Sequence, residues 1–192
     1  MKRLPVLFLP SLALFAGCAV TPVAPDCTPF GRSGQVCLLA PAALPAMNAS
    51  HLISITRDGQ RDTFMGLLQI DEHKLQLLGS SLFGTTLFSI EYDGHAIKSA
   101  PQNTAWHPDM LVVMLELALA DPARLEGRLH DLTLKISDAG QMQVRELYEH
   151  DHVIARIEKT GGSLEQAHIH IDIQPLNLSV QITPLDGAAS PP

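Results

Sequence analysis

The stretch at residues 62–94, DTFMGLLQIDEHKLQLLGSSLFGTTLFSIEYDG, decides the predicted fold. It contains three runs in which apolar residues recur at every second position, separated by Asp71-Glu72-His73 and by residues 79–85. This period is typical of strands in a sheet. The residues that share one face of these runs are Phe64, Leu68, Ile70, Leu75, Leu77, Phe88 and Ile90.

The connection between the second and third runs is unusually apolar for a loop. Leu82 and Phe83 stand at its tip, between Ser81 and Gly84. Large apolar residues at such a tip either bury under the sheet or remain exposed to touch lipid or another protein. Both interpretations stay open at the level of the sequence.

Alternating runs continue on both sides of this stretch, and their number indicates about ten strands. The phase of the last runs changes at Gln174-Pro175, which predicts a bend there. Residues 110–120, MLVVMLELALA, follow Pro108-Asp109, which is a typical helix start. This helix carries Glu116 as its only charged residue. It is too short to span a bilayer and is expected to be buried.

Composition limits the classes of function. The chain has 192 residues and a formal net charge of −7, with 46% hydrophobic and only 5% aromatic residues. This length suits one domain with a core. An acidic chain without a basic patch is a poor ligand for nucleic acid or for anionic lipid by charge alone. We therefore expect no nucleic-acid partner.

The N-terminus is typical of a secretory signal peptide: a basic start at Lys2-Arg3, a short apolar run and then Ala16-Gly17-Cys18. The Cys after Ala-Gly resembles the lipobox of bacterial lipoproteins, although Phe15 replaces the usual leucine. The resemblance implies that Cys18 is the lipidated first residue of the mature chain, with palmitate-type acyl chains. Ala19, rather than Asp, implies sorting to the outer membrane, with the domain facing the periplasm.

These features divide the chain into four segments. Residues 1–17 are the predicted signal peptide, and residues 18–30 are the lipidated cysteine and a tether rich in proline and alanine. Residues 31–185 form the predicted domain, and residues 186–192 form a disordered tail. In an oxidising compartment Cys27 and Cys37 most simply form a disulfide. A metal or redox pair is the alternative.

The order of these elements resembles the LolA/LolB-type fold. The residues that carry the resemblance are HKLQLLGSSLFGTTLFSIEYDG, WHPDMLVVMLELALADPARLEG and RELYEHDHVIARIEK. They are most similar to LolB-like bacterial lipoproteins often encoded within aryl-polyene gene clusters. The resemblance implies a mainly β fold, in which helices cover the concave face of a curved antiparallel half-barrel. In LolB a loop leucine before a glycine helps to pass lipoprotein into the membrane, and Leu82 or Phe83 before Gly84 occupies the matching place. This chain lacks the proline found there and doubles the apolar residue.

The function implied is binding or relay of an acylated ligand, either lipoprotein acyl chains or an aryl-polyene-type lipid. The ligand would come from a LolA-like periplasmic carrier to a monomer that needs no cofactor. A groove lined with aliphatic residues suffices, because each buried methylene contributes about 0.8 kcal/mol. The lining is predicted from the seven strand residues named above. A lid of soft and aliphatic side chains is predicted from Met110, Val113, Met114 and Leu117. Periodicity does not distinguish such a cavity from a packed core.

Three other functions are open. His168, His170 and Asp172 lie on one face of a predicted strand, with His152 nearby, and histidine with carboxylate can bind zinc or copper. A structural accessory protein of the envelope would need neither cavity nor lid. An enzyme lacks support, because the sequence has no G-x-S-x-G, H-E-x-x-H or phosphate-binding loop. We therefore expect no catalytic residues.

Overall fold

The structure is a computed structural model that describes residues 27–100 and 108–185. The predicted signal peptide, Cys18 and the tail at 186–192 lie outside the described residues. Within the described part the fold is mainly β, as the sequence predicts. Its elements form one large antiparallel sheet, one small sheet, two α-helices and three single turns of 3-10 helix.

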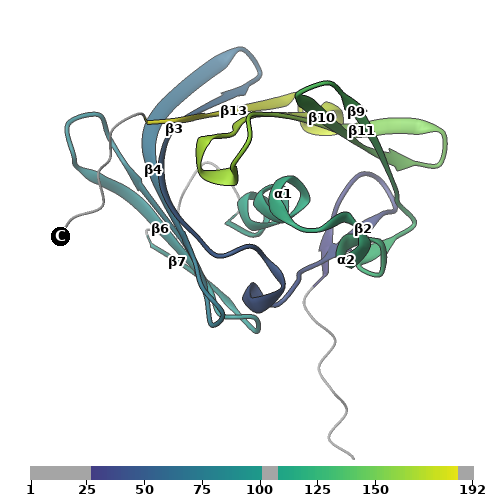
Figure 1. Cartoon of the computed structure of the whole chain (residues 1–192), viewed down its shortest axis with the longest axis horizontal. Coiled ribbons are helices and arrows are strands. Elements are labelled where there is room, and N and C mark those ends of the chain that lie inside the picture. Colours follow the sequence, from purple (N-terminus) through teal and green to yellow (C-terminus); the bar gives the residue numbers. More distant parts are fainter. Residues whose placement is uncertain (1–26, 101–107, 186–192) are drawn as a thin grey trace, which may run out of the picture.

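The large sheet contains ten described strands and is not closed, because its end strands β7 and β9 do not pair with each other. All neighbouring strands run antiparallel. Figure 1 shows how strongly the sheet curves. In spatial order the strands are β7 (Ile97–Ala100), β6 (Thr86–Tyr92), β5 (Leu75–Ser80), β4 (Gln60–Ile70), β3 (Met47–Arg57), β13 (Leu178–Pro184), β12 (His168–Ile173), β11 (His152–Thr160), β10 (Met142–Glu149) and β9 (Thr133–Ala139).

The stretch at residues 62–94 forms three consecutive strands, β4, β5 and β6, as predicted. Their inward residues pack closely: the rings of Phe64 and Phe88 meet edge to face with centroids 5.1 Å apart. Gly79 makes room for the Phe88 ring, which a Cβ at that position would overlap. A register shift between Gly79 and Ser80 accompanies this close approach, one residue before the loop that follows β5.

Two α-helices are described: α1 (Pro108–Leu119) and α2 (Pro122–Glu126). Residues 111–119 of the first are all buried, as expected for so apolar a helix. α1 contacts β7 and β11, from opposite halves of the large sheet, and Figure 1 shows it within the curve of the sheet. Among the described residues, neither helix has the length and hydropathy needed to cross a membrane.

The small sheet orders β1 (Cys27–Pro29), β2 (Gln35–Cys37) and β8 (Leu129–His130). A disulfide joins Cys27 and Cys37, which are directly paired across β1 and β2. The predicted disulfide is therefore confirmed. β1 lies inside the segment assigned to the tether, and Phe30 is buried. The folded part consequently begins no later than Cys27.

The predicted bend at Gln174-Pro175 is a turn of 3-10 helix, η3 (Gln174–Leu176), between β12 and β13. Asn177 ends it in the left-handed conformation, with φ of 47°. Ile173 and Leu178 nevertheless pair in register, so the chain reverses and the apolar face is preserved. The remaining single turns are η1 (Pro41–Ala43) and η2 (Leu164–Gln166).

Candidate functional site

Most of the predicted cavity residues lie in a close-packed interior. The exposed fractions of the ten predicted strand and lid residues other than Met110 are between 0% and 5%. Met110 is partly buried against the same cluster. The ten residues are Phe64, Leu68, Ile70, Leu75, Leu77, Phe88, Ile90, Val113, Met114 and Leu117.

An apolar pocket of about 110 Å³ opens at the first turns of α1. Of the predicted residues, Met110 and Met114 line it. Its volume approaches that of an engineered cavity of about 150 Å³ that binds benzene, so it suits one end of a hydrophobic chain. The other lining residues are Ile55, Arg57, Leu111, Leu176 and Leu178.

The opposite end of α1 is fixed by a buried cation. Arg145 in β10 is 4% exposed, and its Nη1 donates to the carbonyls of Leu117 at 2.9 Å and Ala120 at 2.8 Å. These carbonyls belong to the last turn, where a helix has no internal donors left. A guanidinium there also complements the negative end of the helix dipole. Arg145 therefore ties the end of α1 to the sheet.

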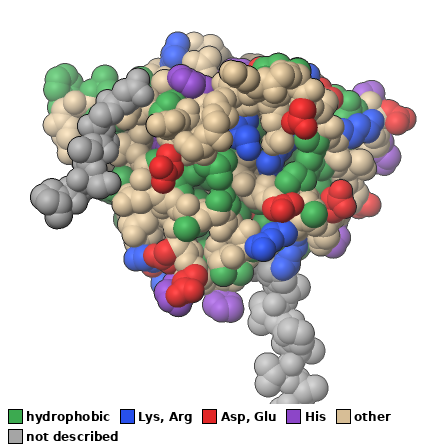
Figure 2. Space-filling model, in the orientation of Figure 1, with side chains coloured by type: hydrophobic (Ala, Val, Ile, Leu, Met, Phe, Trp, Pro, Cys, Tyr) green, Lys and Arg blue, Asp and Glu red, His purple; other side chains and the backbone are tan. Residues whose placement is uncertain are grey.

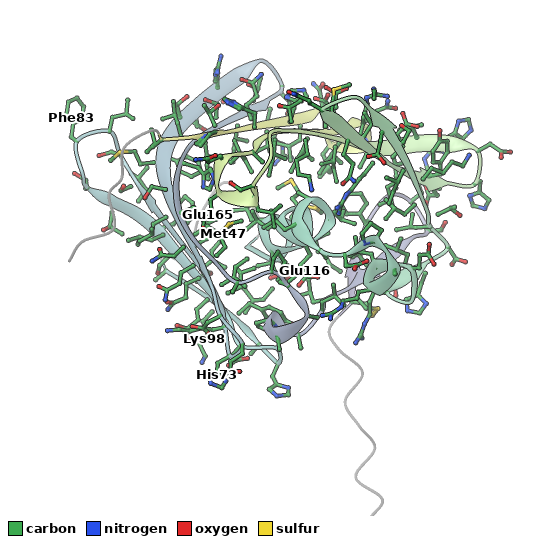
Figure 3. All side chains as sticks on the ribbon, in the orientation of Figure 1. Met47, His73, Phe83, Lys98, Glu116 and Glu165 are labelled. Atoms are coloured by element: carbon green, nitrogen blue, oxygen red, sulfur yellow. A yellow bond between two sulfur atoms is a disulfide. The ribbon has the colours of Figure 1, made fainter. Side chains whose placement is uncertain are left out.

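The middle of α1 carries a buried carboxyl group. Glu116 is 0% exposed, and Figure 3 labels it beside α1 in the interior. Its Oε2 accepts the backbone N–H of Leu39 at 3.0 Å, whereas Oε1 has no hydrogen-bond partner among the described residues. Burial raises the pKa of Glu116 to about 8, against the lowering effects of the Leu39 hydrogen bond and the charge of Arg128. At neutral pH this side chain is mainly the protonated acid.

The loop between β5 and β6 holds its apolar tip outward. Phe83 is 98% exposed and Leu82 is 60% exposed. The Ser81 hydroxyl accepts the N–H groups of Phe83 and Thr85, and Gly84 completes the turn with φ of +83°. Figure 3 shows Phe83 projecting away from the rest of the molecule. The structure thus selects the exposed interpretation of this loop over the buried one.

Further exposed leucines follow the tip along the outer face of the sheet. Leu67 in β4 and Leu78 in β5 are cross-strand partners, with exposed fractions of 40% and 38%. Leu87 in β6 is 43% exposed. In Figure 2 hydrophobic side chains project at the upper left, the region in which Figure 3 labels Phe83. We call Leu67, Leu78, Leu82, Phe83 and Leu87 the outer apolar surface.

The loop that the disulfide closes, residues 28–36, is attached to the large sheet by the carboxylate of Glu149 in β10. Glu149 Oε1 accepts the N–H of Ser33 at 2.6 Å, the Ser33 hydroxyl at 2.9 Å and the N–H of Gly34 at 3.1 Å. Both of its oxygens also accept the N–H of Arg32. Donation from Ser33 and then Arg32 lowers the pKa of Glu149 to about 2. Successive N–H groups of a turn around one anion form a stable nest.

The predicted histidine face does not form a three-ligand group in the described part of the chain. His170 Nε2 lies 2.9 Å from Asp172 Oδ2, but His168 and His152 do not join them within ligand distance of one point. The described residues bring together one such group, made of Cys27, Cys37 and His130. Because its two sulfur atoms form the disulfide, they are not available as thiolates.

Several residues that shape the site were not predicted. Arg145 and Glu149 come from one strand, and their partners lie in segments far away in sequence. Arg57, on the rim of the pocket, was also missed. The sequence carries a signal for Glu116, the only charged residue within the apolar run at residues 110–120, but it does not indicate the partner.

A family model described as "Protein of unknown function (DUF3261)" matches residues 48–186. The match begins in β3 and extends past β13, so it includes α1, the pocket residues and the loop with Phe83. A comparison with curated proteins found no match. Because the matched range covers well over half of the 192 residues, the chain belongs to the DUF3261 family.

Proposed function

We propose that this protein binds the hydrophobic part of an amphiphilic ligand as a lipid-anchored lipoprotein of the outer membrane. The observation that carries the proposal is the apolar pocket at the start of α1, lined by Met110, Leu111 and Met114. Methionine side chains adapt to ligands of different shape. In this proposal α1 covers the concave face of a LolA/LolB-like half-barrel, and its first turns act as the lid.

The outer apolar surface supplies the second part of the proposal. Phe83 is 98% exposed and belongs to a surface with four exposed leucines, and exposed apolar patches mark contacts with lipid or protein. We propose that this tip touches the lipid surface to which Cys18, outside the described residues, anchors the chain. The ligand classes are lipoprotein acyl chains and aryl-polyene-type lipids, with a LolA-like carrier as donor. No catalytic group, metal or cofactor is part of this function.

The close packing of the interior favours one alternative. Phe64, Leu75 and Leu117 leave at most 1% of their surface exposed, so much of the concave face is core and not cavity. A structural accessory lipoprotein would have such an interior and would need no ligand. The two functions differ in whether the pocket at α1 is occupied in the cell.

Native mass spectrometry of the full chain, purified from the envelope of its own host, tests this difference. We expect a bound amphiphile that lipid extraction recovers. Leu178→Trp should fill the pocket and reduce the bound fraction, because Leu178 lines it. Ile136→Trp on the edge strand β9 is the control, since Ile136 is 38% exposed. A chain without bound amphiphile, or equal loading of both variants, would favour the structural role.

A further inference from the structure

A second cleft, of about 490 Å³, lies at the other end of α1. It is bounded by the turn around Ala43, the junction of α1 with α2, and the inward side of β10 and β11. Three basic side chains line it: Arg124, Arg145 and Lys159. In a chain with a formal net charge of −7, this local excess of positive charge calls for an explanation.

Arg145 uses only part of its hydrogen-bonding capacity within the fold. Its Nη1 donates to the end of α1, and its Nε donates to Gln143 Oε1 at 3.0 Å. Its Nη2 has no acceptor in residues 27–100 and 108–185. Burial lowers the pKa of Arg145, and the charge of Asp121 acts in the opposite direction without a hydrogen bond to the guanidinium. A buried guanidinium usually satisfies its donors or pairs with an acid. Nη2 therefore remains as a donor for a ligand in the cleft.

Lys159 stands in the same cleft without a described hydrogen bond or ion pair. Burial lowers the pKa of Lys159, the charge of Arg145 lowers it further, and Asp138 acts in the opposite direction. Two like charges close enough to perturb each other are unfavourable unless a negative group lies between or beside them.

One acidic residue, Asp121, also lines the cleft, and its charge acts favourably on Arg145, so three basic side chains face a single carboxylate. Asp121 caps α2, where its Oδ1 accepts the N–H of Ala123 at 2.9 Å. Arg124 donates through Nη1 to the carbonyl of Ala43 at 2.9 Å, which leaves its other donors at the exposed side of the cleft. Cationic donors therefore converge here from β10, β11 and α2.

We infer that this cleft binds a phosphate or carboxylate group, with Lys159, Arg124 and Arg145 Nη2 as the donors. Arginine pairs well with such planar or tetrahedral oxyanions, and charge-assisted hydrogen bonds to them are strong. Leu44, Leu119 and Leu164 line the same cleft and would contact the apolar part next to the anionic group. The anionic group belongs to the amphiphile of the proposed function or to a free small anion, and only the first source rests on that proposed function.

Binding of matched probes by isothermal titration calorimetry tests the inference. The full chain with Cys18→Ser, which prevents lipidation, is titrated with oleoyl lysophosphatidic acid, with monoolein and with glycerol 3-phosphate. Lysophosphatidic acid and monoolein share the acyl chain and differ in the phosphate. We expect lysophosphatidic acid to bind at least about tenfold more tightly, as expected for one or more charge-assisted hydrogen bonds.

Variants of equal charge assign the binding to the cleft. The double variant Arg124→Gln with Lys159→Gln should bind lysophosphatidic acid about tenfold or more weakly, and its affinity for monoolein should be unchanged. Arg61→Gln with Lys98→Gln removes the same charge from exposed outer positions and should have little effect. Arg124→Lys with Lys159→Arg should retain binding and shows that the cleft tolerates substitution.

Each outcome decides the inference. The anion site is overturned if the two double glutamine variants lose equal affinity for lysophosphatidic acid. It is also overturned if the chain does not prefer lysophosphatidic acid to monoolein. If glycerol 3-phosphate binds as tightly as lysophosphatidic acid and monoolein does not bind, the site stands with a free anion as its ligand, and the proposed function fails. If monoolein binds and the phosphate adds nothing, the proposed function stands without this site.

Discussion

Glu116 in α1 accepts the backbone N–H of Leu39 at 3.0 Å, across 77 residues of sequence. This bond joins the middle of the buried helix to the segment that follows the disulfide. The second oxygen of the same carboxyl group is buried without a described partner. Because an ionised carboxylate there would be poorly solvated, the fold favours the protonated acid.

The stability of the protein should therefore depend on the ionisation of Glu116. Its pKa rises from 4.5 to about 8 in the folded state. Between these pH values the folded chain retains a proton that the unfolded chain has released, so the free energy of unfolding falls as pH rises. The slope from this group is at most about 1.4 kcal/mol per pH unit. Urea unfolding at several pH values from 5 to 8.5 measures it.

Glu116→Gln resembles the protonated acid and should remove this contribution to the slope. The variant should therefore gain stability relative to the natural chain as pH rises. Glu126→Gln, at an exposed position of α2, is the control and should follow the natural chain. If the Glu116 variant keeps the same slope as the natural chain, the buried carboxyl is not the cause.

The nest around Glu149 predicts the opposite dependence. The pKa of Glu149 is lowered to about 2 in the folded chain. The contribution of Glu149 to the free energy of unfolding is therefore complete above its pKa in the unfolded chain, 4.5, and is lost as pH falls toward 2. Glu149→Gln should lower the melting temperature at pH 7 and also loosen residues 31–34. The difference from the natural chain should shrink between pH 4.5 and pH 2. A constant difference over that range, or an equal effect of the exposed Glu72→Gln, would contradict this account.

Arg145 should contribute to stability through the last turn of α1. Arg145→Met leaves the carbonyls of Leu117 and Ala120 without their donor. We expect a loss of about 2–4 kcal/mol in urea unfolding, because hydrogen bonds to charged groups contribute about 1.5–3 kcal/mol each and the methionine recovers part by packing. Arg61→Met, at an exposed position, should change stability by less than about 0.5 kcal/mol. Equal stability of the two variants would argue against the helix-capping role.

Local periodicity predicted the strands well because their side chains alternate between core and solvent. Spacing alone places Phe64 and Leu68 in β4, and Phe88 and Ile90 in β6, on the inward face, and all four are buried. The predicted bend at Pro175 followed from a change of phase, which is also a local signal. The exposure of Phe83 was not predictable, since an apolar loop tip can fold either way.

The sites depend on contacts between distant segments. The pocket at α1 exists because β3 and β13 pair with Leu178 opposite Arg57, and the helix places Met114 nearby. The cleft with Lys159 similarly requires β11 to lie beside the end of α1. No periodic pattern encodes such contacts, so the sequence did not indicate where the pocket and the cleft would lie.

The exposed phenylalanine gives the sharpest test of membrane contact. Phe83→Ser should leave stability within about 0.5 kcal/mol, because a side chain at 98% exposure has few folded contacts to lose. Transfer of a phenyl group into lipid contributes about 2 kcal/mol. The partition coefficient of the variant into neutral phosphatidylcholine vesicles, measured by flotation, should therefore be roughly thirtyfold lower.

The comparison uses the full chain with Cys18→Ser, so that lipidation does not mask the effect. Ile136→Ser removes an exposed apolar side chain from the other end of the sheet and should float like its parent. Equal flotation of the Phe83 and Ile136 variants would assign the tip to a protein partner and not to lipid.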